Sequence, residues 1–279
     1  MFAVVTVALL QTWAVGGSLT SFYAHKPFDS CGVAQLEAEA KEPAVTAQRN
    51  VFPWSVKIHC RCFDENFRRI IVRCHGNLIE TEPGTGRSDV ILTTASCLLK
   101  YTSCRRCEVI KKSINSTIPV SITLANLDFQ KSRQSRNVAL LFTENYLRFN
   151  NKSSPACVDS NRTKDDEKGR CVVTSIADGH AGYFHEVTNY TERTCNNLTK
   201  DVCTEIFLPR PLKTDREGLT MLCLKSNRWF IHAIGDGTSN SNNRTVLDNI
   251  SNSRSWIETK SAYIRSNLPE IIPPKRNSR

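Results

Sequence analysis

Short apolar and β-branched runs, separated by polar turns, dominate the hydropathy pattern of the chain. Each run is only a few residues long, which is the length of a buried strand rather than that of a helix. These strand-like pieces are Trp54–Cys60, Arg69–Cys74, Val90–Thr94, Val120–Leu124, Cys171–Thr174 and Trp229–Ile234. The pattern predicts an all-β fold.

One segment near the C-terminus has a helical period instead. Ser255 is followed three residues later by Glu258, which is the capping-box spacing at the start of a helix. Apolar side chains then recur on one helical face, at Trp256, Ile257, Tyr263, Ile264 and Leu268. The spacing predicts a helix over 253–268, followed by a polar tail over 269–279.

The chain begins with an apolar run, Phe2–Val15, followed by small residues at 16–18. This pattern is typical of a cleaved secretory signal peptide, which we assign to residues 1–17. A membrane anchor is the weaker alternative, because the run is shorter than the ~20 residues that span a bilayer. The polar tail also argues against a lipid-anchor signal, so no stable membrane anchor is expected.

Twelve cysteines and seven Asn-x-Ser/Thr sequons agree with a secreted glycoprotein. The expected glycan acceptors are Asn115, Asn151, Asn161, Asn189, Asn197, Asn243 and Asn249. We therefore expect an extracellular location, which includes secretory vesicles.

The formal net charge is +10, and basic residues gather in the first half of the chain. One interpretation is a generally solvated basic surface. The other is a patch for heparin-like polyanions, with Arg105, Arg106, Lys111 and Lys112 as its candidate residues. Nucleic acid is not expected as a partner outside the cell.

Several motifs follow one another in a fixed order. They are Pro53-Trp54-x-Val56, Cys74-x-Gly76-x-Leu78-Ile79, Leu92-Thr93-x-Ala95-x-Cys97 and Asn137-Val138-Ala139-Leu140-Leu141. In this order they resemble the chymotrypsin/trypsin-like serine proteases. The resemblance covers residues 51–268. It implies two antiparallel six-stranded β-barrels, over about 51–160 and 171–252, ahead of the C-terminal α-helix.

The residues at the catalytic positions of that family are replaced in this chain. The resemblance places Ser96 at the histidine position, Asn137 at the aspartate position and Glu217 at the nucleophile position. Acyl transfer on this fold needs all three of the family's residues. Asp215 also replaces the oxyanion-hole glycine and puts an anion where negative charge must develop. The resemblance thus implies a catalytically inactive member.

Residues 18–50 form a propeptide-like segment that contains Cys31-Gly32-Val33. In zymogens of the resembled family, a cut after Lys or Arg frees an Ile-Val-Gly-Gly terminus. Neither Lys41 nor Arg49 is followed by such a sequence, so the activation switch is expected to be absent.

The resemblance also implies four disulfide bonds, namely Cys74–Cys97, Cys31–Cys157, Cys171–Cys223 and Cys195–Cys203. The remaining cysteines are Cys60, Cys62, Cys104 and Cys107. Two cross-links between the first and the second pair are expected, with the exact pairing open. A four-thiolate zinc site is the weaker alternative in a secreted chain, so no metal and no cofactor are expected.

Two functions remain in competition. The leading hypothesis is a secreted, inactive protease homolog that acts as a binding or scaffold glycoprotein for a protein partner the sequence does not name. Analogy with inactive members of testis and sperm suggests a role in male reproduction. The alternative is a secreted protease with a relocated or very restricted catalytic mechanism.

Overall fold

The computed structural model describes residues 31–34, 45–47, 52–82, 84–99, 103–111, 115–129, 135–150, 153–158, 170–176, 182–187, 189–196, 200–207, 218–236 and 244–271. The signal-peptide segment 1–17 lies outside these residues. So do other sequence-based candidates, namely Glu217, Lys112, Asn151, Asn161, Asn197 and Asn243, and the side chain of Arg105. Over the described residues no helix has the length and apolarity that crossing a bilayer requires.

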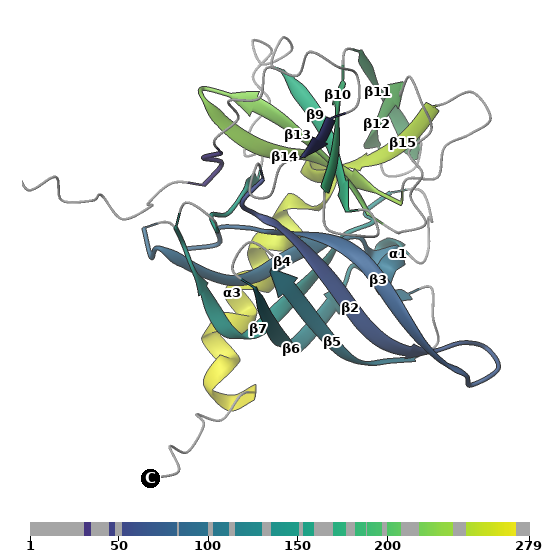
Figure 1. Ribbon diagram of the computed structural model, residues 1–279. Helices are drawn as coiled ribbons and strands as arrows, with labels where there is room; N and C mark the ends of the chain where they lie inside the picture. The colour runs from purple at the N-terminus through teal and green to yellow at the C-terminus, as the bar shows by residue number, and fades with distance from the viewer. Residues whose placement is uncertain are drawn as a thin grey trace, which may run out of the picture.

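The first half of the chain forms a closed six-stranded barrel, in the order β2-β3-β4-β7-β6-β5 (Figure 1). Its strands are β2 (Ser55–Phe63), β3 (Arg69–Leu78), β4 (Arg87–Thr93), β5 (Ser103–Lys111), β6 (Ser116–Ala125) and β7 (Ala139–Arg148). Buried and outward positions alternate along β2, and Val56, Ile58 and Cys60 face the core. Closure leaves this barrel without a free sheet edge.

The second half forms a curled sheet, in the order β1-β10-β9-β13-β14-β15-β12-β11, with β8 pairing parallel to β14. Its strands are β1 (Val45–Ala47), β8 (Cys157–Val158), β9 (Cys171–Ile176), β10 (Gly182–Val187), β11 (Tyr190–Asn196), β12 (Asp201–Phe207), β13 (Leu219–Lys225), β14 (Arg228–Gly235) and β15 (Arg244–Asn249). The all-β prediction is confirmed. The second sheet differs from the expected closed barrel, because β1 pairs along one edge of β10 and β11 forms the opposite edge of the sheet.

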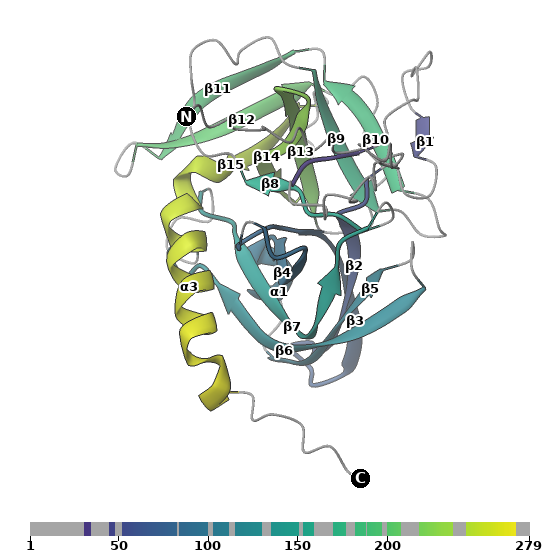
Figure 2. The same cartoon turned by 90° about the vertical axis from the view of Figure 1, so that its left-hand side faces the viewer.

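The chain ends in α3 (Arg254–Ile271), which follows the short 3-10 helix η3 (Ile250–Ser253) and lies along the first barrel (Figure 2). The structure corrects two details of the predicted helix. Asn249 caps the start of η3, whereas Glu258 forms an ion pair with Arg254. Tyr263 faces outward, while Ile257 and Ile264 join the core of the first barrel.

Twelve cysteines form six disulfide bonds. The four pairs that the resemblance implied are present, at Cys31–Cys157, Cys74–Cys97, Cys171–Cys223 and Cys195–Cys203. The open pairing resolves as Cys60–Cys107 and Cys62–Cys104, which join β2 to β5 at directly opposite positions. These sulfurs are bonded to one another and so offer no thiolate to zinc.

The segment before the first barrel is tied to the second sheet at Gly32. Its N–H donates to the Pro155 carbonyl at 2.7 Å, and its own carbonyl accepts from the Trp229 N–H at 2.9 Å. A Cβ at this position would lie 2.6 Å from the Trp229 carbonyl oxygen, and the backbone has φ +75°, so only glycine fits. The Cys31–Cys157 disulfide fixes the same junction covalently.

Candidate functional site

Two of the three residues that the resemblance places at catalytic positions meet where the two halves of the chain face each other. Ser96 lies in the short helix α1 (Ala95–Leu99), and Asn137 lies just before β7. The structure adds a third residue, Asp236, which directly follows β14. Glu217, the third residue that the resemblance places at a catalytic position, lies outside the residues that the structure describes.

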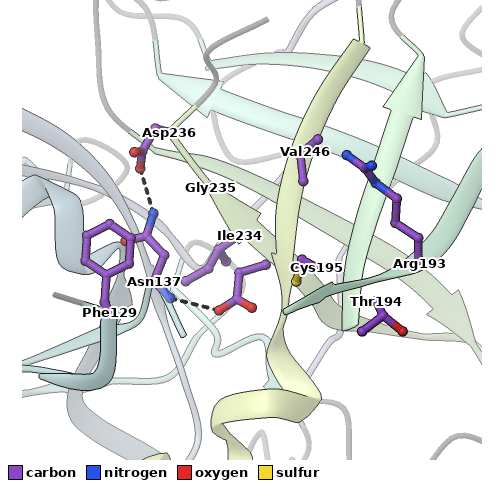
Figure 3. A pocket seen from close by; sticks show the side chains of 10 residues that line it. Phe129, Asn137, Arg193, Thr194, Cys195, Ile234, Gly235, Asp236 and Val246 are labelled. Atoms are coloured by element: carbon purple, nitrogen blue, oxygen red, sulfur yellow. Dashed lines mark hydrogen bonds between the residues drawn. The ribbon is translucent and has the colours of Figure 1, made fainter. Parts of the chain in front are cut away.

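These three side chains form a closed hydrogen-bond network. The Ser96 N–H donates to Asn137 Oδ1 at 2.8 Å, which fixes the orientation of the amide. Asn137 Nδ2 then donates to Asp236 Oδ1 at 2.8 Å, as Figure 3 shows, and lies 3.3 Å from Ser96 Oγ. The Ser96 hydroxyl donates to the same carboxylate oxygen of Asp236. Each of the three side chains therefore has a hydrogen-bond partner within the network.

A second carboxyl group, that of Asp248 in β15, supports Asn137 from behind. Its Oδ2 accepts from the Asn137 N–H at 2.9 Å, and its Oδ1 accepts from Asn252 Nδ2 at 2.7 Å. Burial raises the pKa of Asp248 to about 7, against the lowering effect of these hydrogen bonds. The carboxyl group thus holds the Asn137 backbone from a position removed from solvent.

A pocket of about 380 Å³ opens beside the network (Figure 3). Phe129 and Ile234 give it apolar walls, Asp236 and Asp248 give it acidic ones, and Arg193 stands at the opposite side. The pocket lining therefore carries both positively and negatively charged side chains and little apolar surface.

The chemistry of the network differs from that of a protease triad. A triad needs an imidazole to take the proton of the nucleophile and a carboxylate to orient the imidazole. At Ser96, Asn137 and Asp236 the groups are a hydroxyl, an amide and a carboxylate, and the amide does not exchange protons near neutral pH. This arrangement holds three segments of the chain together without the acid–base pair of a triad.

A serine and a histidine also meet elsewhere, at the buried end of β3. His75 Nε2 lies 3.5 Å from Ser55 Oγ, which is the outer limit of a hydrogen bond. Among the described residues His75 Nδ1 has no side-chain hydrogen-bond partner, so no described carboxylate orients the ring. Burial lowers the pKa of His75 to about 4, against the raising effect of a hydrogen bond with the Gly218 backbone and with a smaller lowering effect from nearby Lys111. A weakly basic imidazole is a poor general base near neutral pH.

Lys111 corrects the polyanion site proposed from the sequence. Its side chain is only 1% exposed, and its ammonium group donates to the backbone carbonyls of Ser55, at 3.0 Å, and of Pro53. Burial lowers its pKa to about 7. A buried amine cannot contact a polyanion, whereas Arg106 is exposed on the same strand.

The described glycosylation candidates differ sharply in accessibility. Asn115 and Asn189 are exposed. Asn249 is only 2% exposed, and its Nδ2 donates to Glu192 at 3.1 Å and to Thr204 at 3.4 Å. Since a glycan is attached through Nδ2, the expectation for Asn249 is incompatible with this fold.

Secreted protein from mammalian cells is expected to carry glycans at Asn115 and Asn189 and none at Asn249. Peptide mass spectrometry after enzymatic deglycosylation in H₂¹⁸O reads each site separately. As controls, Thr117→Ala and Thr191→Ala each remove one exposed sequon and should each lower the mass by one glycan. A labelled Asn249 in folded protein would contradict the buried position of this side chain.

Sequence reasoning missed Asp236 and Asp248. The available signal was the position of Asp236, directly after the strand-like run Trp229–Ile234 and its glycine, where strand ends approach the barrel interface. Asp248 had no comparable signal. A scan against models of protein families and a search of curated proteins found no match for this chain.

Proposed function

We propose that this protein is a secreted, catalytically inactive member of the trypsin-like serine protease family that acts as a binding glycoprotein. The observation that carries the proposal is the Ser96–Asn137–Asp236 network. In it the Asn137 amide nitrogen donates to Asp236 Oδ1 at 2.8 Å, and the Ser96 hydroxyl donates to the same oxygen. Hydrogen bonds that satisfy one another stabilise the fold and leave no base to activate a nucleophile.

The architecture supports the family part of the proposal. A closed six-stranded barrel, a second curled sheet and a C-terminal helix follow one another in the order that the resemblance implies. The six disulfides support an extracellular setting, because disulfides persist in oxidising compartments.

The proposed role is recognition of a protein partner and of a heparin-like polyanion. The net charge of +10 supports the second of these, since it raises the local concentration of anionic ligands. A place in male reproduction rests on analogy with inactive members of the resembled family alone.

A protease with a relocated mechanism is the competing proposal, and the Ser55–His75 contact is the observation that favours it. Its weak points are the 3.5 Å distance, the lack of a side-chain partner for Nδ1 among the described residues and the low pKa of His75. These features leave the competing proposal without a base of suitable strength near pH 7.

The purified, secreted protein is expected to hydrolyse no peptide-amide substrate and to take up no serine-reactive phosphonate. Labelling by intact-mass spectrometry gives the stoichiometry, with an active trypsin as the positive control. Turnover that survives Glu217→Ala and is lost in Ser55→Ala would establish the relocated mechanism. Labelling of the wild type at another serine would also overturn the proposal.

A further inference from the structure

Four exposed arginines lie on the outward face of three neighbouring strands of the first barrel. On β2, Arg61 faces outward between the buried Cys60 and Cys62. On β3, Arg69 and Arg73 are exposed, whereas Val72 between them is buried. On β5, Arg106 is exposed. We call Arg61, Arg69, Arg73 and Arg106 the basic face.

The strand register brings these arginines together. Arg61 lies directly opposite Ile71 on β3 and directly opposite Arg106 on β5. Arg69 and Arg73 flank Ile71, and residues two apart on a strand lie about 7 Å apart, while neighbouring strands lie about 5 Å apart. Four guanidinium groups thus share one strip about 13 Å long on a single sheet surface.

The charge of Arg61 is only partly compensated by a neighbouring carboxylate. Glu108 lies two residues along β5 from Arg106, and its carboxylate is 3.9 Å from Arg61, which is the limit of an ion pair. The Arg61 side chain remains 70% exposed. Two arginines directly opposite each other are unfavourable on a sheet without an anion between them. The pair Arg61–Arg106 therefore calls for an anionic ligand.

Two disulfides hold the strip in place. Cys60–Cys107 and Cys62–Cys104 join β2 to β5 on the inner side of the same sheet, next to Arg61 and Arg106. A surface whose charges are already fixed loses little conformational entropy when it binds an extended, repeating anion.

The hairpin between β2 and β3 adds apolar contact surface to the basic face. It extends beyond the rest of the barrel in Figure 1. Phe67 at its tip is 84% exposed with φ 58°, and Asp64 Oδ1 holds the turn by accepting from the Asn66 and Arg68 N–H groups. Ile71 is 63% exposed between Arg69 and Arg73. Apolar side chains between cations suit an anion that also has apolar faces, as sugar rings have.

We propose that the basic face binds a sulfated polysaccharide, with the chain running along β2 and its sulfates paired with the guanidinium groups. Arginine suits this ligand because its planar donors hold tetrahedral oxyanions in a bidentate manner. The inference deepens the proposed binding function and rests on it, by naming the partner class and the surface. The proposed site lies on β3, β2 and β5. It replaces the group of basic residues proposed from the sequence, which included the buried Lys111.

The test is elution of the full glycosylated protein from immobilised heparin in a salt gradient, with Kd measured for a defined heparin oligosaccharide. Arg61→Ser/Arg106→Ser is expected to weaken binding about tenfold or more, because two charge-assisted contacts are lost. The matched control is Arg148→Ser/Arg228→Ser, which removes two exposed arginines on other strands. It lowers net charge equally and should change Kd by about twofold or less.

Three outcomes would overturn the inference. Equal weakening in both variants would mean that total charge alone binds heparin, and unchanged binding in Arg61→Ser/Arg106→Ser would remove the basic face from the contact. Binding to vesicles of phosphatidylserine without binding to heparin, lost in Phe67→Ser, would assign the hairpin to a membrane surface. The amidase assay tests the proposed catalytic inactivity separately. A failure of the proposed function is therefore distinguishable from a failure of the protein to bind heparin.

Discussion

Raising the pH from 7 to 9.5 is expected to increase the free energy of unfolding by about 3 kcal/mol, through Lys111. Burial lowers the pKa of this amine from 10.5 to about 7. Between these values the unfolded chain binds more protons than the folded chain. Stability therefore rises with pH across this window and is lowest where both states carry the charged amine.

Lys111→Met isolates this effect, because methionine keeps a similar length and removes the titrating group. In the variant the alkaline rise should disappear, while the absolute stability also reflects the loss of a donor to the Pro53 and Ser55 carbonyls. Urea unfolding at several pH values measures both curves. A wild-type curve that stays flat above pH 7, or a variant that keeps the rise, would be at odds with a buried neutral amine.

The acidic side of the profile should be shallower, because two buried groups act in opposite directions there. Burial lowers the pKa of His75 from 6.5 to about 4, so stability through His75 falls as pH drops through this interval. Burial raises the pKa of Asp248 from 3.8 to about 7, so stability through Asp248 grows over nearly the same interval. The two contributions offset each other and leave the alkaline limb as the clearer signal.

Local patterning predicted the first barrel better than the second sheet. The run Val90–Thr94 lies in β4 as far as Thr93, where the strand ends. The run Arg69–Cys74 is the first part of β3, since β-branched runs with buried neighbours pair as strands in most contexts. The strands β11 and β12 carry polar and charged residues on half-exposed faces, and their sequence shows no comparable alternation. Pairing across the sheet determines them, because β12 pairs with β15 and β11 pairs with β12.

The candidate site needed long-range information at every step. Ser96 and Asp236 are 140 residues apart in the chain, and no local pattern brings them together. The pairing of Cys60 with Cys107, rather than with Cys104, depends on the register between β2 and β5. Lys111 shows the same limitation, because a basic residue at a strand end predicts exposure unless its partners are known.

Replacing Asn137 by Asp, the residue that the resembled family has there, is expected to destabilise the fold by about 3 kcal/mol near neutral pH. Asn137 Nδ2 donates to Asp236 Oδ1 at 2.8 Å, and a carboxylate in its place would put two anions in contact. The change also removes a charge-assisted hydrogen bond, worth about 1.5–3 kcal/mol. The loss should shrink in acid, where the two carboxylates share a proton.

A double-mutant cycle with Asp236→Asn separates this interaction from general damage to the site. In Asn137→Asp/Asp236→Asn an amide again faces a single carboxylate, so most of the lost stability should return, with a coupling free energy of about 2 kcal/mol. Thermal and urea unfolding of the four proteins measure it. Additive losses would mean that the contact between residues 137 and 236 does not hold the site together. Recovery would mean that Asp236 and an aspartate at position 137 destabilise each other, so that Asp236 favours the amide found at this position.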